Sequence, residues 1–244
     1  MNSEIQDSIE SSIALKPASG DTLPKLDAAV LSADLVLAVM QDRNLSPEVI
    51  AQISGNDAAM KSRKVRLALA AHSRTPRRIA LRLIRELYTF DLMQFSLLPS
   101  VAADLKRFAD DLLVGRLASV SLGERISLAR RSSGRVAGAL LLDGESRVWQ
   151  TALENPRLAE SALVKTLLRP EASPAFVKAV CQHAKWSVRP EIRMALLRNQ
   201  YTPLARALEL ARRLPPARLR DILHSSRLPE KIKTYLRKDL EARK

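Results

Sequence analysis

Residues 65–76 read VRLALAAHSRTP, and this stretch decides the fold. Ala68 and Leu69 follow Val65 after three and four positions, which places all three side chains on one face of an α-helix. In the closing pair, Thr75 is predicted to cap a second helix with its side-chain oxygen, and Pro76 to occupy the first helical position, where a missing N–H costs nothing. The stretch therefore predicts a helix, a break and another helix, with an apolar face that needs a neighbour.

Two further stretches share this frame, namely VLAVMQDRNLSP at residues 36–47 and IRMALLRNQYTP at residues 192–203. Each opens with an aliphatic residue and closes with Ser-Pro or Thr-Pro eleven residues later. Successive prolines lie 29 residues apart, from Pro47 to Pro76 and from Pro174 to Pro203, a spacing that fits one unit of two helices. The predicted N-caps of the second helices are Ser46, Thr75, Ser173 and Thr202.

Weaker copies of the frame fill the rest of the chain. The copies at Ile126 and Val148 have Ala137 and Ala159 where proline stood. The Ile126 copy is preceded by S-x-x-E at residues 121–124, the spacing of a capping box. Looser copies occupy residues 176–187 and 218–236. The sequence therefore predicts an all-α fold of about seven to eight short helix pairs.

This succession of copies resembles the HEAT-like leucine-rich-repeat-variant class, and it is similar to a bacterial HEAT-like family known only as a domain of unknown function. The resemblance covers most of residues 36–244 and implies an α-solenoid, a right-handed superhelix of stacked helix pairs, with no specific activity. Some variant-repeat proteins carry an iron–sulfur cluster on clustered cysteines. Here Cys181 stands alone in mid-chain, so no cluster is expected.

The beginning of the chain differs in charge from the rest. Residues 1–34 carry a net charge of −4, which leaves +18 for the remaining residues. Residues 16–25 combine Pro, Ser, Gly and Thr and are typical of a linker. We expect residues 1–28 to be a disordered acidic tail and linker, although Ile5, Ile9 and Ile13 also fit a short amphipathic helix, and residues 29–244 to form one domain. A further hypothesis is that the tail folds back on the basic domain.

Composition limits the classes of protein. A formal charge of +14 and a pI near 10.5 favour an acidic partner. A single cysteine excludes an intramolecular disulfide framework. The acidic N-terminus has no basic or apolar stretch of a secretory signal, and the longest aliphatic run, Val136 to Leu142, is far shorter than the roughly 20 residues of a membrane helix. These features predict a cytoplasmic protein.

The residues that usually carry chemistry have structural interpretations in the repeat. His72 and His183 occupy the position, seven residues after the opening aliphatic, that Asn155 and Asn199 hold in other copies. That position is the end of the first helix, where a side chain can bond unpaired carbonyls. Cys181 and His183 alone are too few ligands for zinc. Neighbouring Asp110 and Asp111 diverge by about 100° on a helix and cannot share a proton. We therefore expect no catalytic, cofactor or metal site.

The basic residues are the main candidates for binding. Arginine favours bidentate contact with phosphate or carboxylate, and repeated arginines on equivalent helices of a solenoid would form a basic strip. Alternatively, arginine serves here as a helix-forming, solubilising residue. The candidates for contact with an anionic partner are Lys64, Arg66, Arg78, Arg82, Arg85, Arg189, Arg193, Arg206 and Arg213. Trp149 lies beside the expected core stripe, so it is a candidate partner anchor or a packing residue.

These observations predict a non-enzymatic scaffold that binds a protein partner through an extended surface. The alternative is a nucleic-acid-binding solenoid that grips the phosphates of DNA or RNA. Because aromatic residues are not interleaved with the arginines, stacking on single-stranded bases is not expected.

Overall fold

The computed structural model describes residues 32–242, and this part of the chain is all-helical, with sixteen α-helices, one short 3-10 helix and no strand. The predicted tail, residues 1–28, lies outside the described residues. The α-helices are α2 (Ala33–Val39), α3 (Pro47–Ser54), α4 (Asp57–Met60), α5 (Arg63–Ala71), α6 (Arg77–Glu86), α7 (Thr89–Leu97), α8 (Ala103–Arg116), α9 (Leu122–Arg131), α10 (Gly134–Leu140), α11 (Ser146–Leu153), α12 (Glu160–Leu167), α13 (Pro174–Gln182), α14 (Pro190–Arg198), α15 (Leu204–Arg212), α16 (Pro216–Ser225) and α17 (Glu230–Glu241); the 3-10 helix η1 (Leu117–Ser119) follows α8.

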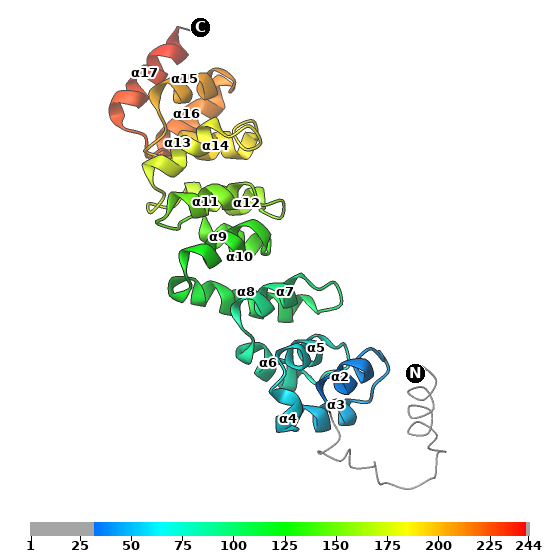
Figure 1. The fold of residues 1–244 in the computed structure, drawn as a ribbon. Coiled ribbons are helices and arrows are strands. Elements are labelled where there is room, and N and C mark those ends of the chain that lie inside the picture. The colour runs from blue at the N-terminus through cyan, green and yellow to red at the C-terminus, as the bar shows by residue number, and fades with distance from the viewer. Residues whose placement is uncertain (1–31, 243–244) are drawn as a thin grey trace.

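The helices follow one another in chain order along one long axis (Figure 1). Most of them pack against a helix two places away, and several also pack against the helix before or after them. One row of contacts runs without interruption through α6, α8, α10, α12, α14 and α16, and a second row includes α5 with α7, α9 with α11, α11 with α13, and α15 with α17. The chain therefore alternates between two layers of helices, so that residues one helix pair apart lie side by side.

Serine caps begin several helices as the sequence predicts. Ser46 accepts a hydrogen bond from the Val49 N–H at the start of α3, and Pro47 follows at the first turn. Ser173 caps α13 in the same way. Ser121 and Glu124 form the predicted capping box of α9. These starts are fixed locally because the serine oxygen replaces a missing intrahelical acceptor.

The prediction that Thr75 and Thr202 cap the following helices is wrong. The N-caps of α6 and α15 are the prolines, Pro76 and Pro203. Each threonine hydroxyl instead donates backwards over 2.6 Å, to the carbonyl oxygen of Leu69 or Leu196 in the last turn of the preceding helix. Each carbonyl also accepts the backbone N–H of the C-cap residue, His72 or Asn199, so the hydroxyl is a second donor that stabilises a helix end rather than a helix start.

The copy at Ile126 departs from the frame. Helix α10 begins at Gly134 behind the N-cap Ser133, three residues before the expected Ala137. The next loop crosses close to the start of this helix. A Cβ atom on Gly134 would lie 2.1 Å from the carbonyl oxygen of Arg157, so only glycine allows this approach.

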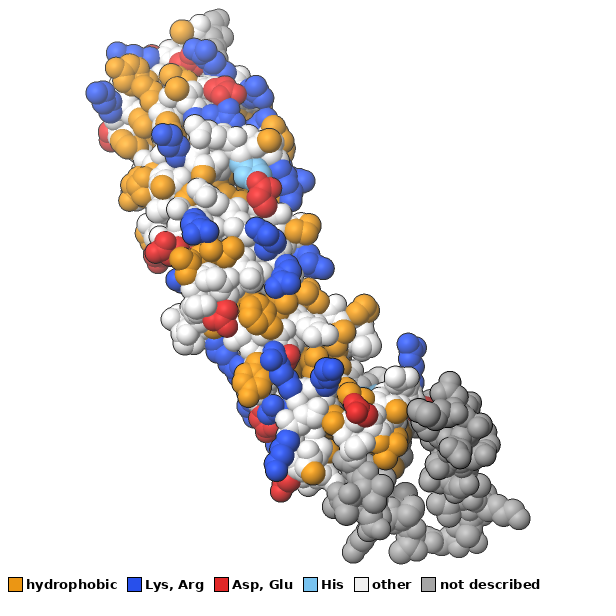
Figure 2. Space-filling model, in the orientation of Figure 1, with side chains coloured by type: hydrophobic (Ala, Val, Ile, Leu, Met, Phe, Trp, Pro, Cys, Tyr) orange, Lys and Arg blue, Asp and Glu red, His pale blue; other side chains and the backbone are white. Residues whose placement is uncertain are grey.

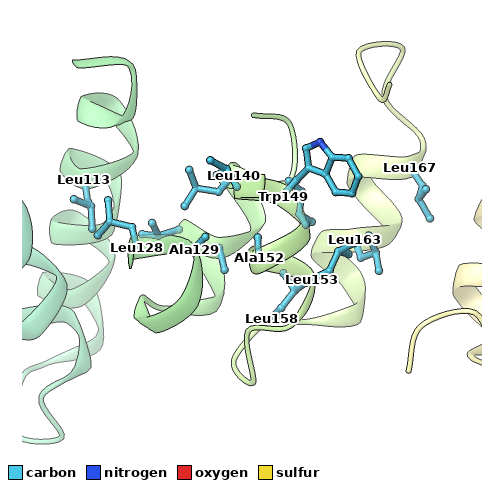
Figure 3. Packing of buried hydrophobic residues seen from close by; sticks show 14 of the residues in the cluster. Leu113, Leu128, Ala129, Leu140, Trp149, Ala152, Leu153, Leu158, Leu163 and Leu167 are labelled. Carbon is cyan, nitrogen blue, oxygen red and sulfur yellow. The ribbon is translucent and has the colours of Figure 1, made fainter. Parts of the chain in front are cut away.

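The core is one cluster of small and medium aliphatic side chains that extends through successive helices, including Leu113, Leu128, Leu140 and Leu163 (Figure 3). Trp149 belongs to this cluster. Its side chain is 5% exposed and meets the Phe176 ring of α13 edge-on, with 5.7 Å between ring centroids. The structure thus corrects the expectation of an exposed anchor at Trp149 and places this residue in the packing between helix pairs.

A polar side chain at the end of one helix bonds the end of its neighbour in the same layer. Asn155 donates to the carbonyl oxygens of Ala129 and Ser132, at 2.8 and 3.2 Å, at the end of α9. Asn199 donates over 2.6 Å to the carbonyl oxygen of Leu167, the last residue of α12. Both side chains also accept an N–H from two residues further along their own chain segment. The amide therefore holds its own turn and joins it to the previous pair.

His72 and His183 lie at the ends of α5 and α13, as the frame predicted. Their Nδ1 atoms accept the N–H two residues on, from Arg74 and Lys185. The Nε2 atom of His72 lies 3.0 Å from the carbonyl oxygen of Asp42, beyond α2, and that of His183 lies 3.0 Å from a carboxylate oxygen of Glu154, beyond α11. The hydrogen bond of His72 therefore joins neighbouring helix pairs, and the His183 ring lies beside the end of the neighbouring helix α11.

Candidate partner-binding surface

Of the acidic and thiol side chains that the sequence singles out, Asp110 and Cys181 are buried and Asp111 is exposed. Asp110 is buried and accepts a hydrogen bond of 2.8 Å from Ser133, and this burial raises its pKa. Asp111 pairs instead with Arg135. Burial raises the pKa of the Cys181 thiol to about 11, so it stays protonated at neutral pH.

Residues 32–242 hold neither a cluster of metal ligands nor a helix that could span a membrane. No group of three or more His, Cys, Asp or Glu side chains in this range is placed to hold a metal ion. None of the helices described in it has both the length and the apolar character needed to cross a membrane.

The nine candidate basic residues fall into two groups. Lys64 and Arg66 lie on α5, and Arg78, Arg82 and Arg85 on α6. Arg189 precedes α14, Arg193 lies on it, and Arg206 and Arg213 lie on and directly after α15. Helices α7 to α13 separate the two groups, so these residues do not make one continuous strip. Figure 2 shows Lys and Arg side chains distributed along the visible face, mixed with hydrophobic and acidic ones.

The C-terminal group is engaged with its own surroundings. Arg189 pairs with Glu160 of α12 at 3.1 Å. Arg206 and Arg213 both pair with Glu209. The Nε of Arg193 donates to the carbonyl oxygen of Ser187 over 3.1 Å. A partner that used these guanidinium groups would compete with carboxylates and carbonyls already in place.

Arginine also joins helix pairs at positions that sequence analysis did not single out. Arg116 donates to the carbonyl oxygens of Leu87 and Arg85, at 2.6 and 2.8 Å, at the end of α6. Other ion pairs between neighbouring helices of one layer join Arg63 to Asp91, Arg77 to Asp104, and Arg212 to Asp239. Part of the arginine excess is therefore explained by contacts within the fold. The periodic pattern gave no signal for these contacts, because the partner residues lie one helix pair away in the chain.

On the first layer, Lys64 lines a groove of about 600 Å³ between α5 and α7, together with Leu67, Ala68 and Leu98. Arg66 is half-buried, and its guanidinium lies 5.6 Å from the centre of the Tyr88 ring. Tyr88 is 57% exposed, and sequence analysis missed it because it lies in the short connection between α6 and α7. Tyr88 is therefore an exposed aromatic residue whose ring lies beside basic side chains.

On the second layer, the three arginines of α6 face α3 across a groove of about 610 Å³. They recur after four and three residues, so they share one face of the helix. Apolar residues Ala51, Pro76 and Ile79 also line the groove. Among residues 32–242, no carboxylate lies within ion-pair distance of Arg78, Arg82 or Arg85. Lys64, Arg66 and Arg193 likewise have no carboxylate at that distance in this range, but Arg78, Arg82 and Arg85 line one groove together and leave their positive charge available to a partner there.

Comparison with protein-family models, with curated proteins and with solved structures gives no match. The HEAT-like resemblance therefore stays a prediction.

Proposed function

We propose that this chain is a non-enzymatic interaction scaffold, an α-solenoid of HEAT-like helix pairs that binds a protein partner in the cytoplasm through its extended surface. The observation that carries the proposal is a set of similar grooves between helices one pair apart. They measure about 610 Å³ between α3 and α6, 600 Å³ between α5 and α7, and 550 Å³ between α13 and α15.

The lining of these grooves supports a protein partner. Each combines small apolar residues with basic and polar side chains, as in the pairing of Leu67 and Ala68 with Lys64, or of Pro203 and Ala205 with Lys178. A polypeptide that lies across the helices presents both apolar and polar groups at each step, and stacked repeats commonly offer such extended surfaces.

The chemistry of the side chains supports a role without catalysis. Asp110 and Cys181, which would otherwise be candidate acid and nucleophile, are buried in packing, and both have their pKa raised towards the uncharged form. The lone thiol also favours the reducing cytoplasm.

Nucleic-acid binding is the second candidate function. The observation that favours it is the α3–α6 groove with its three arginines without acidic partners. Against it, Arg189, Arg206 and Arg213 are paired with carboxylates, which leaves little of a continuous phosphate-binding strip.

Affinity capture and a duplex-binding assay together test the two functions. The full chain, immobilised, is expected to recover a defined protein from a lysate of its source cells, and the purified pair should bind saturably. A labelled duplex of about 30 base pairs should not shift at about 50 mM salt. A duplex shift whose affinity falls steeply with salt, with no protein recovered, would overturn the scaffold in favour of nucleic acid.

A further inference from the structure

We propose that the groove between α3 and α6 binds an extended acidic segment of the partner protein, with Arg78, Arg82 and Arg85 receiving its carboxylates. This assignment rests on the proposed scaffold function and adds the site and the chemistry of the partner. It begins from the charge of the groove, since its lining includes these three arginines and no acidic residue.

Two of the three guanidinium groups are already held in position. One Nη of Arg82 donates to the carbonyl oxygen of Ser54 at the end of α3, over 3.0 Å. The guanidinium of Arg85 lies 5.5 Å from the centre of the Phe108 ring of α8. An arginine has five N–H donors, so each group keeps several for a ligand. Because the side chains are held before binding, less conformational entropy is lost when a carboxylate arrives.

The spacing of the arginines suits an extended peptide. Arg78 and Arg82 are separated by about 6 Å along the helix axis, and Arg82 and Arg85 by about 4.5 Å. In an extended chain, side chains on the same face recur after about 6.8 Å. Acidic residues at alternate positions therefore face the arginines, and the side chains between them face away from the groove.

The limits of the charged surface favour a short acidic segment over a nucleic acid. The three arginines span about 10 Å of the helix. Next to them on α6, Arg77 pairs with Asp104, and beyond the helix end Arg116 is bonded to two carbonyls. A nucleic-acid backbone gains its affinity from many phosphate contacts over a longer path. The aromatic ring beside Arg85 is occupied by that side chain.

A matched pair of variants on α3 tests the site. Ala51 is exposed and lines the groove, whereas its neighbour Gln52 is exposed and does not. Ala51→Glu places a carboxylate among the arginines, and Gln52→Glu makes the same change in net charge outside the groove. The probe is a fluorescein-labelled peptide of alternating Glu and Ala residues, and the control peptide has Gln in place of Glu.

Fluorescence anisotropy with the full chain should show saturable binding of the Glu peptide and at least about tenfold weaker binding of the Gln peptide. Ala51→Glu should weaken binding of the Glu peptide about tenfold. Arg78→Gln should weaken it about fivefold, and Gln52→Glu should change it by less than about twofold. Equal losses in Ala51→Glu and Gln52→Glu, or equal binding of the two peptides, would overturn the assignment. The assignment would also be overturned if a nucleic-acid duplex bound the wild-type chain and bound Ala51→Glu more weakly, while the Glu peptide did not bind.

The captured partner separates failure of this site from failure of the scaffold. If the partner binds wild type and Ala51→Glu equally, the groove assignment is wrong and the scaffold function stands. If no protein partner is recovered at all, the scaffold function fails whatever the peptide does.

Discussion

Replacing Asn199 by alanine should destabilise the junction between α12 and α14. The side chain is 5% exposed, its Nδ2 donates to the carbonyl oxygen of Leu167, and its Oδ1 accepts the N–H of Tyr201 over 2.8 Å. Truncation leaves both backbone groups without this partner. A buried group left unpaired costs about 1–3 kcal/mol. The Tyr201 side chain is 39% exposed, so water can reach that part of the turn more easily. We expect a total loss of about 2–4 kcal/mol in the free energy of unfolding.

Urea unfolding followed by circular dichroism measures this loss, and Gln200→Ala is the matched control. Gln200 is the next residue, is exposed, and makes no hydrogen bond in the described part of the chain. Its truncation should cost less than about 0.5 kcal/mol. Because proteins open locally in cooperative units, hydrogen exchange should show the lost protection concentrated in α12 to α16. A loss below about 0.5 kcal/mol for Asn199→Ala, or one matched by Gln200→Ala, would refute the idea that the amide joins the helix pairs.

Three further predictions concern packing, a helix end and the thiol. Trp149→Ala should lower the free energy of unfolding by about 3–5 kcal/mol, because it removes the buried indole from its contact with Phe176, and thermal unfolding will show this. Thr202→Val keeps the shape but removes one of the two donors to the carbonyl of Leu196, so urea unfolding should show a loss of about 0.5–1.5 kcal/mol, whereas Thr202→Ser should lose less. Burial raises the pKa of the Cys181 thiol to about 11, so the unfolded chain loses this proton first as the pH rises above the ordinary thiol pKa. Relative to Cys181→Ala, the wild type should therefore lose stability between pH of about 9 and about 11. A constant difference in stability over that range would contradict the buried thiol.

The helical class and several helix starts were accessible from sequence because their signals are local. Several helices begin directly after a capping serine, namely Ser46, Ser173 and Ser121 with Glu124. Such caps depend only on residues three apart. The position of His72 and His183 at helix ends followed from the same frame.

The errors arose where neighbouring pairs interact. Thr75 and Thr202 bond carbonyls six residues back, an alternative that the Thr-Pro pattern does not distinguish from a cap. Trp149 lies on a face that only the next helix pair, through Phe176, makes into core.

For the candidate surface, the common face of Arg78, Arg82 and Arg85 was predictable from their spacing, since they lie on one helix. The sequence could not predict which arginines remain available to a partner, because the carboxylates that engage Arg189 and Arg63 lie about one helix pair away in the chain. Charge excess alone therefore overestimated the extent of the binding surface.

The most direct test of the scaffold function is nuclease digestion of the complex between the purified chain and its captured protein partner, followed by light scattering. We predict one complex of defined stoichiometry that survives digestion, because polypeptide contacts hold it together. Loss of the partner on digestion would show that nucleic acid bridges the two proteins and would contradict a scaffold that binds its partner directly.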